Sequence, residues 1–167
     1  MRSTTNSLVI RRLADTDLDA VVALSLAAWA PVFASLEEQL GSAIFTTIYP
    51  DWRQTQAASV RAVCGAPENE VWVADVGDGA VGFVAVGIVA EDAARAGEIH
   101  MIAVDPGHQQ AGIGAALMRQ ALAAAEAHGV DLAVIATGGD PGHAPARALY
   151  ERFGFRPLPG VRYYRAM

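Results

Sequence analysis

The stretch from Glu98 to Leu117 constrains the fold of this chain more than any other part of the sequence. Residues 98–104 are mostly apolar, which predicts a buried strand. Asp105-Pro106-Gly107 ends the strand, because proline cannot join a central ladder and glycine allows the chain to turn. Gly112-Ile113-Gly114 and a long alanine- and leucine-rich helix follow. This order presents free backbone N–H groups and a helix dipole to an anion, so the stretch predicts a site for a phosphorylated ligand.

Two common phosphate-binding loops do not fit this stretch. A mononucleotide P-loop needs the lysine of G-x-x-x-x-G-K-[ST], and the chain contains no lysine. A dinucleotide-binding fingerprint needs its glycines directly after the strand and a small third residue, but several loop residues intervene and Leu117 occupies the third position.

Two motifs do resemble a known family. Gln109 to Gly114 resembles the Q/R-x-x-G-x-G/A pyrophosphate loop of the GNAT superfamily of N-acetyltransferases, which use acyl-coenzyme A, and residues 102–106 match its usual lead-in. Residues 146–155 are similar to the A-x-x-L-Y-x-x-x-G-F segment of the same family. Many members carry arginine where Gln109 stands, and glutamine adds no charge there. The resemblance implies that acetyl-CoA is bound by Ile102, Ala103, Val104, Gln109, Gln110, Ala111, Gly112, Ile113, Gly114, Ala115, His143 and Tyr150.

The remaining elements suit one α/β domain over residues 1–167. A first strand over residues 8–13 precedes a helix that runs to Ala28 and is interrupted at Pro31; the second helix begins after a capping box at residues 35–38. Next come a third helix over residues 51–65 and two strands joined at residues 77–79. A loop over residues 93–97 then leads to the central strand and its helix. The chain ends with a strand over residues 130–137, a short helix, and two extended pieces near Phe155 and residues 162–165. By resemblance this is the GNAT fold, a mixed, mostly antiparallel sheet of six to seven strands with a V-shaped splay between the central strands.

Composition excludes several classes of protein. Hydrophobic residues make up 53% of the 167 residues and charged residues 18%, which argues against disorder. We expect no membrane partner, because no apolar run has the length of a span and no signal peptide is visible. A net charge of −6 argues against nucleic-acid binding. The lone Cys64 excludes a disulfide framework and favours the cytoplasm, and no residue set has the spacing of a metal site.

Acyl transfer to an amine needs a proton donor for the leaving thiolate and a base for the attacking amine. Tyr150 is the candidate acid, because its phenol has a pKa of about 10, near that of a thiol, and the family's acid commonly occupies this position. Glu98 and His100 are both candidate bases; they are two residues apart on one strand and so share a face. The sequence does not choose between them.

The acceptor pocket is expected from the N-terminal helices, with Trp29 and Phe33 as its walls. These residues predict an N-acetyltransferase that acts on a small-molecule primary amine by direct attack in a ternary complex. The alternatives are a protein or peptide N-terminal acetyltransferase and a non-catalytic acyl-CoA sensor. A homodimer through the C-terminal strands is a further expectation, because their edge would otherwise be exposed.

Overall fold

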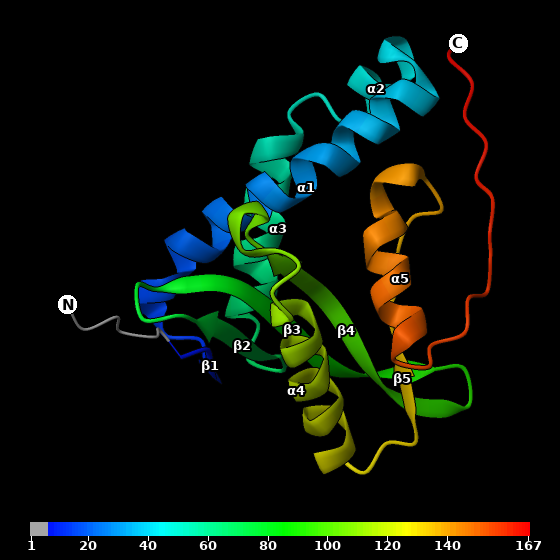
Figure 1. Ribbon diagram of the computed structural model, residues 1–167. Helices are drawn as coiled ribbons and strands as arrows, with labels where there is room; N and C mark the ends of the chain where they lie inside the picture. The colour runs from blue at the N-terminus through cyan, green and yellow to red at the C-terminus, as the bar shows by residue number, and fades with distance from the viewer. Residues whose placement is uncertain (1–6) are drawn as a thin grey trace.

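The structure is a computed structural model that describes residues 7–167, and it contains one five-stranded sheet in the order β1-β2-β3-β4-β5. Figure 1 shows α1 and α3 on one side of this sheet, α4 on the other, and α5 beside β5. The strands are β1 (Val9–Arg12), β2 (Glu70–Asp75), β3 (Ala80–Glu91), β4 (Ala94–Val104) and β5 (Leu132–Val134). The helices are α1 (Leu18–Leu40), α2 (Ser42–Ile48), α3 (Trp52–Gly65), α4 (Ile113–Ala127) and α5 (Ala144–Arg152), with 3-10 turns η1 (Asp15–Asp17), η2 (Pro106–His108) and η3 (Pro141–His143).

The central strands separate at one end, as the family resemblance implies. Neighbours from β1 to β4 are antiparallel, whereas β4 and β5 are parallel. Their pairing begins at Ala96 with Leu132 and ends at Glu98 with Val134. From Ile99 onward β4 therefore has no ladder partner on this side among the described residues, and a V-shaped opening results.

Each face of the sheet carries its own apolar core. One core joins α4 to the sheet through fully buried side chains such as Leu117, Met118 and Val84. The other joins α1 and α3 to the opposite face through side chains such as Val21, Val60 and Phe83. Tyr150 of α5 belongs to the first core, which fixes α5 next to the opening between β4 and β5.

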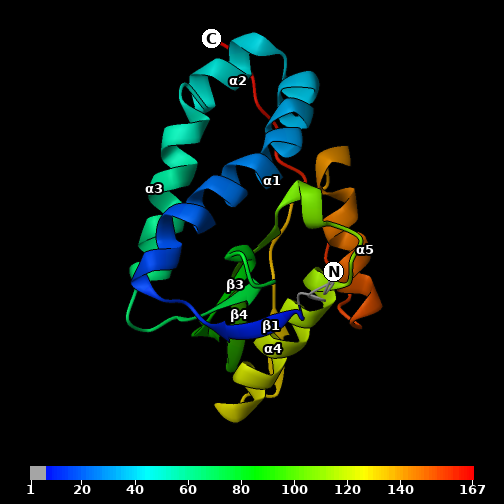
Figure 2. The ribbon, with the colours of Figure 1, turned by 60° about the vertical axis from the view of Figure 1, so that its left-hand side comes forward.

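The N-terminal helices differ from the prediction. Pro31 does not interrupt the first helix, since α1 continues to Leu40 and ends at Gly41, which has a φ of 74°. The expected capping box at residues 35–38 therefore lies inside α1. Burial of Val32 and the contact of Ser35 with η3 outweigh the hydrogen bond that proline removes. In Figure 2, α1 runs as one long helix beside the sheet.

The uninterrupted helix has a second consequence. Asp15–Leu40 is long and apolar enough to cross a membrane by length and composition alone, with a mean hydropathy of 1.7 in its most apolar window. The sequence analysis divided this segment and so did not detect such a length. A core helix of a water-soluble domain passes the same test, and α1 contributes Val21 and Leu24 to the core described above.

The strands also differ from the prediction at three places. Most of the expected loop over residues 93–97 belongs to β4, since residues 94–97 pair with β3 as far as Glu91 with Ala94. The fifth strand is three residues long instead of eight. The extended pieces after Phe153 form no strand, so the sheet has five strands instead of six to seven. The C-terminal segment runs past α5 toward α2 (Figure 1), with Leu158 98% and Tyr163 90% exposed.

Candidate active site

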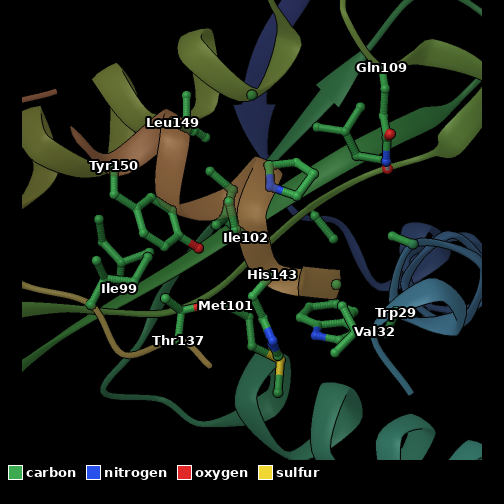
Figure 3. Close-up of a pocket in the computed structure, with 18 of the residues that line it drawn as sticks. Trp29, Val32, Ile99, Met101, Ile102, Gln109, Thr137, His143, Leu149 and Tyr150 are labelled. Atoms are coloured by element: carbon green, nitrogen blue, oxygen red, sulfur yellow. Dashed lines mark hydrogen bonds between the residues drawn. The ribbon is translucent and has the colours of Figure 1, made fainter. Parts of the chain in front are cut away.

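A cavity of about 760 Å³ occupies the opening between β4 and residues 135–137. Its walls come from five parts of the chain: the end of β4, the segment after β5, the N-terminus of α4, α1, and η3 with α5. Figure 3 shows Tyr150, Ile102, His143 and Trp29 around this cavity. The divergence of β4 from β5 therefore creates the space, and the helices close it.

The glycine loop lies at one end of this cavity. Gly112, with a φ of 80°, precedes the first residue of α4, and Gln110 also has a left-handed φ of 64°. The first amides of α4 have no partner within the helix, so Ile113, Gly114 and Ala115 present N–H groups there. A Cβ at Gly112 would meet no heavy atom within 4 Å, and one at Gly114 only the side chains of Leu149 and Val104 at 3.5 and 3.9 Å. The loop thus has room for a diphosphate.

The side chain of Gln109 makes a hydrogen bond within the protein. Its Nε2 donates to the carbonyl of Val104 at 3.1 Å and so ties the loop to the end of β4. The sequence analysis placed Gln109 among the residues that bind acetyl-CoA. This bond uses one of the two N–H groups of the side chain, so backbone amides are the main donors that this loop offers to an anion.

Tyr150 places a hydroxyl in an otherwise apolar part of the cavity. The residue is 9% exposed, its ring packs edge-on against Phe155 with centroids 6.2 Å apart, and Figure 3 shows the hydroxyl pointing into the cavity. Burial raises the pKa of Tyr150 to about 12. Within residues 7–167 the hydroxyl has no hydrogen-bond partner. It is protonated at neutral pH and available to a bound ligand.

Glu98 and His100 are neighbours in space, on a strand with a bulge. The register shifts so that Ala85 pairs with Met101 and Val86 with Ile99, which leaves His100 as the extra residue. His100 Nδ1 lies 3.6 Å from a Glu98 carboxylate oxygen, so both side chains share a face, as predicted. A Cβ added to Gly87 would come 2.7 Å from His100 Nε2, so the imidazole lies against β3. His100 lines the main cavity and also a second one of about 420 Å³, whereas Glu98 lines neither.

The sequence Asp-Pro-Gly-His occurs twice, at residues 105–108 and 140–143, and folds twice into the same turn. In each turn the aspartate accepts from the glycine N–H at 2.9 Å and contacts the histidine Nδ1. The first pair is open to solvent, with His108 45% and Asp105 36% exposed. The second is enclosed, with His143 19% and Asp140 4% exposed.

The second turn is fixed from two sides. Gly142 N–H donates to Ser35 Oγ of α1 at 3.0 Å. Arg147 of α5 donates to the carbonyls of Gly138 and Asp140 at 2.7 and 2.8 Å, so it holds the loop instead of reaching a phosphate or pointing to solvent. Burial opposes ionisation of Asp140, but hydrogen bonds from His143 and Ser35 outweigh it and hold the pKa of Asp140 below its ordinary value.

The two aromatic residues expected to form the acceptor pocket lie in different places. Trp29 lines the main cavity. Phe33 does not, because it stacks on Trp52 with ring centroids 4.3 Å apart and packs edge-on against Tyr49 at 5.4 Å. That cluster holds α1, α2 and α3 together.

The cavity thus brings together most of the residues selected from the sequence. Those that line it are Trp29, His100, Ile102, Ala103, Val104, Gln109, Gln110, Gly112, Gly114, Ala115, His143 and Tyr150. Those that do not are Phe33, Glu98, Ala111 and Ile113. Sequence reasoning missed Asp140 and Ser35, and the repeated tetrapeptide was the signal that could have indicated Asp140. No group of three or more metal-ligating side chains occurs among the residues that the structure describes.

Comparison with known proteins gives one family. A family model described as an acetyltransferase (GNAT) domain matches residues 67–157. A mycothiol acetyltransferase of Beutenbergia cavernae is 41% identical over 99 residues, which cover 54% of this chain and 32% of that protein. The chain thus spans about a third of this curated relative.

Solved structures of low sequence identity share the fold. A GCN5-related N-acetyltransferase from Ralstonia eutropha JMP134 is 20% identical over 95% of this chain and 99% of its own, with a TM-score of 0.63. An aminoglycoside N-acetyltransferase, AAC(6')-Iy, solved in complex with CoA, is 17% identical over 99% of each chain, with a TM-score of 0.64.

Proposed function

Because the chain belongs to the GNAT acetyltransferase family, we propose that it transfers the acetyl group of acetyl-CoA to a primary amine of a small molecule. The amine attacks the thioester directly while both substrates are bound. The observation that carries the proposal is the cavity between β4 and residues 135–137, because it joins an anion-binding loop at one end to the free hydroxyl of Tyr150.

The chain's own groups suffice to bind and orient the thioester. Amides at the start of α4 would hold the diphosphate, and Gly112 keeps the backbone there open to the ligand. Beyond Glu98 the β4 backbone has no partner in β5, so its amides and carbonyls can bind an amide-rich arm. An N–H near Ile102 to Val104 is the donor that the family resemblance assigns to the thioester carbonyl.

Tyr150 would donate the proton to the leaving sulfur. With its pKa raised to about 12 it is a weaker acid than the sequence analysis assumed. Donation is therefore expected as the C–S bond breaks and negative charge develops on sulfur, not before. Glu98 and His100 stay candidates for the base, acting directly or through water.

The walls of the cavity favour a small acceptor. Trp29, Val32 and η3 form walls of the cavity, and we expect walls of this kind to suit a compact amine better than an extended peptide. The relatives include proteins named for mycothiol and for aminoglycosides. The alternatives remain a protein N-terminal acetyltransferase and a non-catalytic acyl-CoA sensor; a sensor has no need for a free phenol in the cavity.

Thermal unfolding with acetyl-CoA, CoA, NADH or ATP tests ligand binding first. Selective binding to the folded state raises stability by about 2.7 kcal/mol at a hundredfold excess over Kd. We expect a higher Tm with acetyl-CoA and CoA only. Thiol release with a panel of small amines and N-terminal peptides then tests transfer. An unchanged Tm with acetyl-CoA would refute binding of this cofactor, and a higher Tm without thiol release would favour the acyl-CoA sensor.

The cytoplasmic location, the absence of membrane and nucleic-acid partners and the homodimer stay predictions. The C-terminal strands expected at the dimer interface do not form, but Leu158, Val161 and Tyr163 are exposed apolar residues of the C-terminal segment. Light scattering would give a dimer mass if this surface joins two copies.

A further inference from the structure

The turn of Asp140 and His143 places a second histidine in the cavity, and its tautomer follows from its partner. An ionised carboxylate can only accept, so the Nδ1 that contacts Asp140 must carry the hydrogen. Nε2 of the neutral ring then keeps its lone pair. A Cβ on Gly138 would come 2.5 and 2.8 Å from Nδ1 and Cε1, so that edge of the ring faces the loop. The rest of the ring lines the cavity with Trp29 and Met101 (Figure 3).

His100 is held differently. Its Nδ1 lies 3.6 Å from Glu98, beyond hydrogen-bond distance, and its Nε2 lies against Gly87 at the border of the second cavity. Glu98 does not line the main cavity. Of the three candidates, His143 alone combines a buried carboxylate partner with a place in the main cavity.

We propose that His143, oriented by Asp140, is the base that takes the proton from the acceptor amine. The inference rests on the proposed function and deepens it. The amine nitrogen forms a C–N bond with the acetyl carbon, and the C–S bond breaks with its electron pair moving to sulfur. Sulfur receives the Tyr150 proton, and the proton released from nitrogen goes to His143 Nε2. The phenolate and the imidazolium then return to their starting states by proton exchange through water.

The groups around the ring fit this role. Among residues 7–167, Asp140 supplies the one negative charge in contact with His143, and Arg147 of α5 binds the carbonyls of the same loop. From α1 come the uncharged Trp29, Val32 and Ser35. His100 of β4 and Tyr150 and Arg152 of α5 line the same cavity. Asp140 is thus a positioning residue, and its carboxylate would stabilise the imidazolium that forms.

The experiment compares wild type with His143→Gln, His100→Gln and Glu98→Gln, using the accepted amine of lowest pKa. The matched control is His108→Gln, which alters the same tetrapeptide where it is exposed. We expect kcat of His143→Gln, measured at saturating acetyl-CoA, to fall by about a hundredfold or more. If His143 is the base, the fall in wild-type activity that we expect toward acid pH should be absent from this variant. The other variants should keep that dependence.

Asp140→Asn tests the positioning role. Without the carboxylate the imidazolium is less stable, so the acid limb of the profile of kcat/KM against pH should move to lower pH, which a purely structural defect would not do. Asp105→Asn should leave the limb in place. Full activity and an unchanged acid limb in folded His143→Gln would overturn the proposal while leaving the acetyltransferase function intact. Wild type that neither binds acetyl-CoA nor releases thiol would refute the function itself.

Discussion

The backbone amide of Gly142 donates a hydrogen bond to Ser35 Oγ at 3.0 Å, across 107 positions of sequence. This bond joins α1, which walls the acceptor side of the cavity, to η3, which carries His143. The geometry of the candidate base therefore depends on a helix from the other end of the chain. The contact exists only because α1 continues beyond Pro31, and the bond in turn stabilises that part of the helix.

Gly142→Ala tests this contact. A Cβ at Gly142 would come 2.8 Å from Val32 Cα and from Ser35 Cβ, and the first of these is backbone that cannot rotate away. We expect a loss of about 1–3 kcal/mol in the free energy of unfolding and a lower kcat. Urea unfolding measures the first and thiol release the second. Gly107→Ala is the matched control, since its Cβ would meet only the Asp105 carboxylate, at 3.1 Å; equal effects in both variants would contradict the prediction.

Tyr150→Phe separates chemistry from packing. The ring belongs to the α4-side core, but its hydroxyl has no partner among residues 7–167, so stability should change by about 0.5 kcal/mol or less. We expect kcat to fall by about a hundredfold or more while acetyl-CoA still raises the Tm. Because burial raises the pKa of Tyr150 to about 12, its ionisation should not limit wild-type activity near neutral pH. Tyr163→Phe, at a residue 90% exposed, is the control.

The ion pair of Arg11 and Asp17 should make stability depend on acid pH. Arg11 donates to both Asp17 carboxylate oxygens, at 2.6 and 2.9 Å, and these hydrogen bonds hold the pKa of Asp17 below its usual value. Because the pKa of Asp17 is lower in the folded than in the unfolded state, its ionised form stabilises the fold at pH values above the unfolded-state pKa of about 3.9. This stabilisation is lost as the pH falls through the folded-state pKa. Asp17→Asn should therefore be less stable by about 1–3 kcal/mol at pH 7.

The difference between Asp17→Asn and wild type should shrink below about pH 4, as followed by urea unfolding at several pH values. Asp19→Asn serves as the control, because the Asp19 side chain is 89% exposed in its pair with Arg61 and should matter little. A constant difference at every pH would contradict the ionic origin of the effect.

Gly97→Ala tests the packing of α4 on β4. Its Cβ would come 2.4 Å from the Cβ of Ala125, a residue 3% exposed in the α4-side core. We expect a loss of about 1–3 kcal/mol in the free energy of unfolding. Ala125→Gly removes the clashing methyl, at about 1 kcal/mol of helix propensity, so the double variant should be more stable than the sum of the single effects indicates. Strict additivity would disprove the contact.

Several features could be predicted because their signals are local. The β2–β3 hairpin, the Asp51 cap of α3, the glycine loop and α4 follow from side-chain period, glycine and capping residues close in sequence. The A-x-x-L-Y segment is also a local motif, and it correctly predicted that Tyr150 lies on a short helix. Its position in the cavity required only that α5 pack beside β5.

Other features were decided by distant contacts. Ser35 has the sequence of a helix start, yet it lies inside α1, where its hydroxyl accepts a hydrogen bond from Gly142. His108 and His143 share one tetrapeptide and one turn, but only His143 is enclosed, because α1 and the segment after β5 surround it.

The sequence by itself determined the family, the strand–loop–helix that can bind a diphosphate, and the tyrosine that can donate a proton. Each of these depends on residues within about one turn or strand of each other, where propensity and backbone freedom dominate. Only the tertiary structure decided which histidine reaches the cavity, that Gln109 ties the loop to β4, and that Phe33 packs among helices. Those outcomes depend on burial and on hydrogen bonds between elements far apart in sequence, which no local pattern records.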